Sequence, residues 1–163
     1  MRLNTISDWE ELLAARLPLY GHRNWIVIAD AAYPAHSAPG IETVVAGVSQ
    51  QAAIEAVLAQ LCACTHVRPV VHLDRELEFV LEGDAPGIDS YRAWLRGALT
   101  SMSVRSAPHE EIIAALDRAA QLFSILIVKS TMAIPYTSIF LELQCGYWNE
   151  DAEARLRSAI EHG

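Results

Sequence analysis

The chain has 163 residues, a formal net charge of −8 at pH 7 and a pI near 5.1. Hydrophobic residues make up 52% and charged residues 20%, which is typical of a globular chain with a real core and not of a disordered one. The acidic balance argues against nucleic acid or an anionic membrane as partner, because both select basic surfaces. A small neutral molecule fits the composition better.

The length predicts one domain over residues 1–163. Residues 1–5 lack the apolar stretch of a signal peptide, and no apolar run approaches the roughly 20 residues of a membrane span, so we expect a cytoplasmic protein. Cys62, Cys64 and Cys145 form no Cys-x-x-Cys pair. Buried free thiols are therefore expected, with metal ligands as the weaker alternative.

The first predicted helix runs from Asp8 to about Arg16, with Ser7 as its N-cap and Glu10 completing a capping box. Pro18 ends this helix, and the following Gly21 allows a turn.

That turn presents His22 just before a short apolar run, residues 25–29, which is typical of a strand covered on both faces. Asp30 closes the run, and Pro34 prevents a helix from starting there. Because ligands of open α/β sheets bind where strands end, Asp30 is a candidate site residue by position and His22 by chemistry.

The middle of the chain predicts a strand over residues 41–48 and a helix over 50–61 that is capped by Ser49. Gln50 lies outside the apolar stripe of this helix. Two further strands are expected over residues 67–73 and 76–81, the second half-exposed because charged and apolar residues alternate in it.

In the last third, a helix is expected over residues 90–98, and another begins at Pro108 and carries apolar residues as far as Leu122. Strands follow over 123–128 and 137–143. Asn149 then caps a charged helix over 150–161. This alternation of strands and helices along the chain predicts an α/β fold: a single three-layer α/β/α domain with a largely parallel or mixed central sheet.

The sequence motifs of several kinds of chemistry are absent. There is no glycine-rich phosphate loop and no Gly-x-Ser-x-Gly elbow, and a metal held by His22, Asp30 and His36 rests on residue types alone. The groups that remain suit acid/base work on a neutral polar ligand: His22, Asp30, His36, His109, Tyr136 and Ser138. Taken singly, each of these residues favours a structural role over a catalytic one: each histidine as a surface residue, Asp30 as a turn cap and Tyr136 as packing at the rim of the core.

Two segments resemble the ribose pyranase and fucose mutarotase family. Gly21-His22, the strand at 26–29, Asp30-Ala31 and Tyr33-Pro34 follow the family's opening motif, in which phenylalanine or leucine precedes the proline. Residues 123–143 are similar to the family's apolar strand, short loop, Tyr-x-Asn and final strand, with Tyr136-Thr137-Ser138 in place of Tyr-x-Asn. Pro108-His109-Glu110-Glu111 resembles a helix start of the pyranases, whose histidine binds sugar.

The chain departs from this pattern at three places. Ser138 replaces the asparagine, Lys129-Ser130-Thr131 lacks the family's Gly-Glu, and the segment from His109 to Tyr136 is longer. Residues 149–163 are an extra C-terminal helix.

The resemblance implies a ribose-pyranase-like fold and a cofactor-free isomerase, a monosaccharide mutarotase or pyranase acting on a sugar such as fucose or ribose. By the same resemblance, His22 is the general acid/base, Tyr136 contacts the sugar or relays the second proton, and Asp30, His109 and Ser138 bind substrate. No metal is implied, and a homo-oligomer is expected, for which a ring-like assembly is one form. The alternative is a non-catalytic sugar-binding or regulatory relative with the same pocket. Nothing in the resemblance requires His36.

Overall fold

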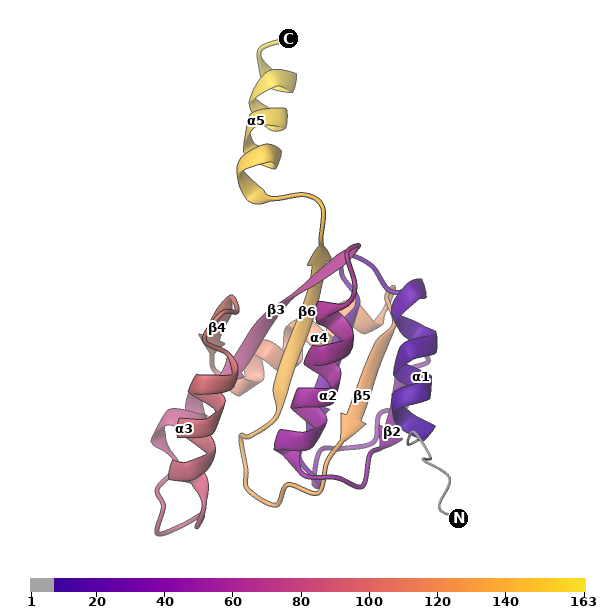
Figure 1. Cartoon of the computed structure of the whole chain (residues 1–163). Helices are drawn as coiled ribbons and strands as arrows, with labels where there is room; N and C mark the ends of the chain where they lie inside the picture. Colours follow the sequence, from indigo (N-terminus) through magenta and orange to yellow (C-terminus); the bar gives the residue numbers. More distant parts are fainter. Residues whose placement is uncertain (1–7) are drawn as a thin grey trace.

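The structure is a computed structural model that describes residues 8–163, so the predicted cap Ser7 lies outside the described residues. Five α-helices and six strands follow one another along this part of the chain, with short 3-10 helices after α1 and β3 (Figure 1). In chain order they are α1 Asp8–Arg16, η1 Leu17–Leu19, β1 Trp25–Ala29, β2 Ile41–Val45, α2 Gln50–Cys62, β3 Val67–Asp74, η2 Arg75–Phe79, α3 Ile88–Ala98, β4 Val104–Ala107, α4 His109–Ala120, β5 Ile125–Lys129, β6 Ile139–Cys145 and α5 Glu150–Glu161.

The six strands form one sheet in the order β2-β5-β1-β6-β3-β4. β2 with β5, β5 with β1 and β3 with β4 pair in parallel, whereas β6 is antiparallel to both β1 and β3. Five strands therefore point the same way and only β6 runs against them. The predicted largely parallel or mixed sheet is confirmed.

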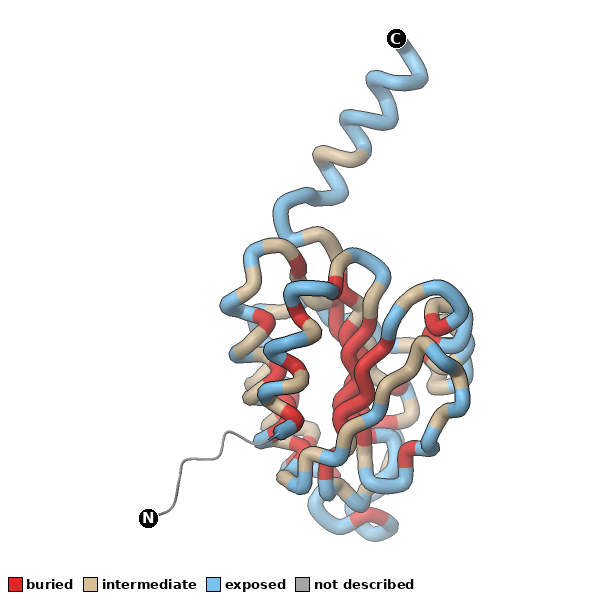
Figure 2. Tube along the Cα trace, turned by 90° about the vertical axis from the view of Figure 1, so that its right-hand side faces the viewer, coloured by how far each residue is buried: buried red, intermediate tan, exposed pale blue. Residues whose placement is uncertain are grey.

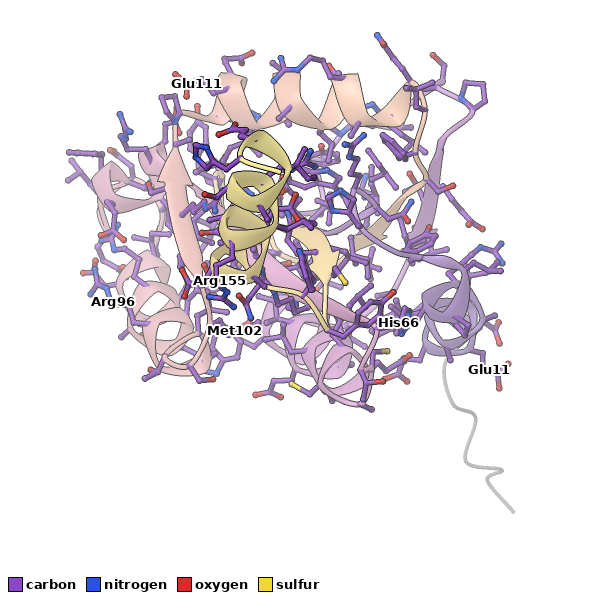
Figure 3. The ribbon with its side chains drawn as sticks, turned by 90° about the horizontal axis from the view of Figure 1, so that it is seen from above. Glu11, His66, Arg96, Met102, Glu111 and Arg155 are labelled. Carbon is purple, nitrogen blue, oxygen red and sulfur yellow. The ribbon has the colours of Figure 1, made fainter. Side chains whose placement is uncertain are left out.

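Helices cover both faces of the sheet, as expected for three layers. Viewed from above, the helix that carries Glu111 lies on one side, and the helices that carry Glu11 and Arg96 lie on the other (Figure 3). The larger core joins α1, α2 and α3 to alternate residues of the central strands, and the smaller core joins α4 to the residues between them, such as Val27 and Ile127. β1 is buried along its whole length, which explains its continuous apolar sequence.

The predicted strand over residues 76–81 is wrong. This segment is the 3-10 helix η2, of which only Leu77 is buried, while Phe79 is 75% exposed. The sequence did not predict β4, because its four residues are exposed or half-buried and show no apolar face. The strand expected over 41–48 ends at Val45, and Leu122 lies beyond α4 and is exposed.

The three cysteines are free, but the expectation that they are buried is wrong, because Cys62 is exposed and the other two are half-buried. Within residues 8–163, no helix is both long enough and apolar enough to cross a membrane.

The last helix, α5, stands apart from the three layers and contains no buried residue (Figure 2). It begins beyond the end of β6, with Asn149 as its N-cap: the side chain accepts a hydrogen bond from the backbone N–H of Ala152. The predicted cap and helix are both confirmed.

Candidate functional site at the carboxyl edge of the sheet

Polar side chains gather where the parallel strands end. Asp30 directly follows β1, Ser130 follows β5 and Asp74 is the last residue of β3. Ser138 precedes β6, which starts at this edge because it runs against its neighbours, and His109 is the first residue of α4. We call this rim of the sheet the carboxyl edge and the opposite rim the amino edge.

Asp30 and Ser138 are joined by two hydrogen bonds. The Ser138 hydroxyl donates to Oδ1 of Asp30 over 2.7 Å and accepts from the Asp30 backbone N–H over 3.0 Å. The second carboxylate oxygen, Oδ2, accepts from the backbone N–H of Ala32, so Asp30 is also the turn cap that the sequence allowed. Ser138 is buried and Asp30 half-buried, which leaves the carboxylate within reach of a ligand.

Asp74 and His109 form a second pair at the same edge. Nδ1 of His109 lies 2.9 Å from Oδ1 of Asp74, and because a carboxylate only accepts, Nδ1 carries the donated proton. Nε2 is then the imidazole atom free to take up or release a proton. Burial raises the pKa of Asp74 to about 6, against the lowering effect of the His109 hydrogen bond and charge, while the Glu76 and Asp30 carboxylates add to the rise.

Neighbouring groups hold His109 in place. Both carboxylate oxygens of Glu76 accept from its backbone N–H, at 3.1 and 3.0 Å, which also places a negative charge at the positive end of α4. The Tyr136 ring meets the imidazole edge-on, with ring centroids 5.7 Å apart and planes 79° apart.

A cavity of about 340 Å³ lies beside the Tyr136 ring. It is lined by Arg75, Glu76, Phe79, Val80, Pro108 and Tyr136. Tyr136 is 40% exposed, so its ring is available to a ligand in this cavity.

His22 lies elsewhere, at the amino edge just before β1 begins. Its side chain is exposed, and its Nε2 accepts a hydrogen bond from Nε of Arg23 over 3.2 Å. It borders a larger cavity of about 640 Å³, which also contacts Arg68, Arg105 and Trp148 at the base of α5. Since β1 separates His22 from Asp30, one chain cannot bring both to the same ligand.

His36 contacts Tyr33 in the loop after β1, with ring centroids 5.7 Å apart. Because His22 is at the other edge, His22, Asp30 and His36 cannot hold one metal ion. No group of three histidine, cysteine or carboxylate side chains within residues 8–163 is arranged to do so.

The structure thus brings Asp30, His109, Tyr136 and Ser138 to one edge and leaves His22 apart. The sequence analysis missed Asp74, the partner of His109, and Gln50, a buried amide below the site. One signal for Asp74 was available: like Asp30, it is the carboxylate that closes an apolar strand. The stripe pattern of α2 gave no signal for Gln50.

No protein-family profile and no curated protein sequence matches the chain. Among the solved structures that match it are three with identities of 19% to 23%. RbsD of Bacillus subtilis, solved with D-ribose, has a TM-score of 0.57 and 19% identity over 91% of this chain and 99% of its own.

FucU of Bifidobacterium longum has a TM-score of 0.53 and 20% identity over 83% of this chain and 92% of its own. The fucose mutarotase of Streptococcus pneumoniae, solved with L-fucose, has a TM-score of 0.52 and 23% identity over 86% of this chain and 94% of its own. The chain therefore has the fold of RbsD and the fucose mutarotases, as its sequence motifs predicted.

Proposed function

We propose that the protein is a cofactor-free monosaccharide mutarotase or pyranase, an isomerase that interconverts the anomers or ring forms of a sugar such as fucose or ribose in the cytoplasm. The observation that carries the proposal is the Asp74–His109 pair, which lies at the same edge as Asp30 and Ser138. The shared fold with proteins solved with D-ribose and L-fucose supports it.

The reaction needs two proton transfers. One proton leaves the anomeric hydroxyl and another reaches the ring oxygen, so that the ring C–O bond breaks as the aldehyde forms. Rotation about the C1–C2 bond and the reverse transfers close the ring in the other form. A positioned acid/base group contributes about 10²- to 10⁴-fold to such a step.

Within one chain, Nε2 of His109 is the group suited to the first transfer, because Asp74 holds the opposite ring nitrogen and stabilises the imidazolium that forms. Asp30 accepts hydrogen bonds from sugar hydroxyls. Tyr136 packs on the sugar and donates from its hydroxyl, as the motif implied, and Ser138 fixes the Asp30 carboxylate.

His22 can take part only if a second copy of the chain brings its amino edge to this carboxyl edge. The predicted homo-oligomer provides such an arrangement. In it, His22 of a second copy delivers the second proton, which keeps the acid/base role that the motif implied for His22.

The test is saturation-transfer NMR of anomer exchange on a panel of reducing sugars, with the wild type beside His109→Ala and Asp30→Asn. We expect the wild type to accelerate exchange of at least one sugar, and each variant to lose at least tenfold while its circular dichroism spectrum is unchanged. Exchange in His109→Ala equal to the wild type would remove His109 from the mechanism.

A second function is a sugar-binding or regulatory protein without turnover. It is favoured by the Ser138 hydroxyl, which already donates to and accepts from Asp30, whereas the family's asparagine has amide groups to spare. Under this alternative, the wild type binds sugar without accelerating exchange and Ser138→Asn gains activity. A fully active wild type rules it out.

A further inference from the structure

Gln50, the first residue of α2, is 1% exposed although it lies outside the apolar stripe of the helix. Its amide nitrogen donates to the backbone carbonyls of Ile28 (3.1 Å) and Thr137 (2.9 Å). Its amide oxygen accepts from the Ser130 hydroxyl over 2.6 Å. All three partners belong to the end of β1 or to the segment between β5 and β6, so one side chain ties together the segments that carry the candidate site.

The Thr137 carbonyl accepts a second side-chain hydrogen bond, from another helix. The Tyr91 hydroxyl of α3 donates to the same Thr137 carbonyl over 2.6 Å, and burial raises the pKa of Tyr91, so this hydroxyl keeps its proton. The Thr137 hydroxyl in turn donates to the carbonyl of Ile134 over 2.7 Å. Thr137 is fully buried and lies directly between the site residues Tyr136 and Ser138.

Tyr136 has a backbone φ of 60°, in the left-handed region that residues with a side chain rarely adopt. Such a conformation is strained and persists only where its surroundings enforce it. Here it accompanies the edge-on contact of the Tyr136 ring with His109.

We propose that Gln50 is a positioning residue of the site: by holding the Thr137 carbonyl, it keeps Tyr136 in its left-handed conformation and its ring against His109. The kinetic consequences rest on the proposed function, whereas the effect on the Tyr136 backbone does not. Gln50 acts through Thr137 and has no contact with substrate in this scheme.

Gln50→Glu distinguishes this role from a general contribution to the core. A carboxylate has no hydrogen to donate and cannot bond the two carbonyls, whereas a protonated carboxyl regains one donor. Because burial disfavours the charged form, protonation takes place at a higher pH than for an exposed glutamate. The defect of the variant is therefore expected to shrink as the pH falls.

The matched control is Gln60→Glu on the same helix, where the amide donates to the Glu10 carbonyl over 3.1 Å, away from the site. For the wild type and both variants, kcat/KM for anomer exchange is measured from pH 5 to 8, and backbone NMR shifts of Tyr136 are recorded without sugar. We expect Gln50→Glu to lose at least tenfold in kcat/KM at pH 8, to recover relative to the wild type toward pH 5, and to shift Tyr136 at pH 8. Gln60→Glu should match the wild type throughout.

Unchanged Tyr136 shifts in Gln50→Glu, or a ratio of kcat/KM to the wild type that does not depend on pH, would overturn the positioning role. If this variant does not fold, Tyr91→Phe replaces it: it removes the second donor to Thr137, and it must shift Tyr136 in the same direction. A wild type that accelerates no sugar overturns the proposed function, and the Tyr136 shifts then decide the positioning role alone.

Discussion

Asp74 is 2% exposed, and the histidine beside it is the group that lowers the pKa of its carboxyl most. Its Oδ2 has no hydrogen-bond partner among the described residues. Burying a charge in this way opposes folding, which is common where a group is placed for chemistry. Asp74 thus contributes to the site at a cost to stability.

The pH dependence of stability follows from the Asp74 pKa, which is about 6 in the folded protein and 3.8 ordinarily. Between these values the folded protein holds the proton more tightly than the unfolded chain, so this group's contribution to stability falls as the pH rises from about 4 to 6. A difference of about two pKa units corresponds to about 3 kcal/mol as an upper bound. We expect Asp74→Asn to unfold at a higher temperature than the wild type at pH 8 but not at pH 4, and to lose activity.

Thermal unfolding at both pH values checks this, with the exposed Asp84→Asn as control. An equal gain at pH 4 and pH 8 would show that ionisation of Asp74 is not the cause.

Tyr33 stands where the resembling family has phenylalanine or leucine. It is 5% exposed, and its hydroxyl has no hydrogen-bond partner within residues 8–163. Burial raises the pKa of this hydroxyl, and the carboxylates of Asp117, Asp74 and Asp30 raise it further. The ring packs 6.3 Å from Phe140, centroid to centroid, so the ring and the hydroxyl make separable contributions.

We expect Tyr33→Phe to increase the free energy of unfolding by about 1 kcal/mol, because it removes an unpaired buried polar group and keeps the ring. Urea denaturation measures the change. Tyr20→Phe deletes a hydroxyl from another buried tyrosine, at the amino edge, and is not expected to give the gain. A loss of stability in Tyr33→Phe would mean that the hydroxyl is bonded in solution.

At the scale of elements, the strands that the sequence predicted best are those buried on both faces. β1 is a continuous apolar run, β5 is one as far as Val128, and β6 begins as one over Ile139, Phe140 and Leu141. The alternation of Glu76, Leu77, Glu78 and Phe79 has the period of a strand, yet it forms η2, because Glu76 caps α4 and Glu78 pairs with Arg96 instead. Tertiary contacts of this kind leave no local signal.

The residues of the candidate site could be predicted only where the end of a strand could be predicted. Asp30 follows a recognisable strand, and the Tyr136–Ser138 motif precedes another. The contact between Asp74 and His109 joins positions 35 residues apart, and it depends on how β3 and β4 pair at the edge of the sheet. Since β4 itself carries no apolar pattern, that pairing could not be predicted from local sequence.

α5 contributes no buried residue, and its contacts to the rest of the chain are exposed, such as the Arg105–Glu150 pair at 3.8 Å. Exposed ion pairs contribute little to stability. Removing residues 149–163 is therefore expected to change the unfolding temperature by less than about 2 °C, since about 1 kcal/mol moves it by 2–4 °C in a domain of this size. Calorimetry of the truncated chain tests this, and a larger decrease would show that α5 packs against another surface in solution.

At the scale of the whole molecule, the predicted site residues lie at two opposite edges of the sheet. His22 is at the amino edge, while Asp30, His109, Tyr136 and Ser138 are at the carboxyl edge. If both sets act on one sugar, each site combines the amino edge of one copy with the carboxyl edge of another. The homo-oligomer stays a prediction, and this division makes it testable.

We expect His22→Ala and His109→Ala to be inactive separately and to regain anomer exchange when they are unfolded together and refolded as a mixture. A mixed assembly contains some sites in which both histidines are intact, whereas each variant alone contains none. Light scattering of each sample reports assembly. Failure of the mixture to regain activity, although both variants assemble, would exclude His22 from a shared site.

The single reversed strand, β6, also determines where the chain finishes. It starts beside Asp30 and carries the backbone across the sheet, so α5 and the C-terminus lie beyond the amino edge, far from Asp74 and His109 (Figure 1). A biotin or affinity tag added after Gly163 would hold the protein on a sensor surface with its carboxyl edge facing the flowing solution. Surface-based measurement of sugar binding by one copy is thus best designed around the C-terminus.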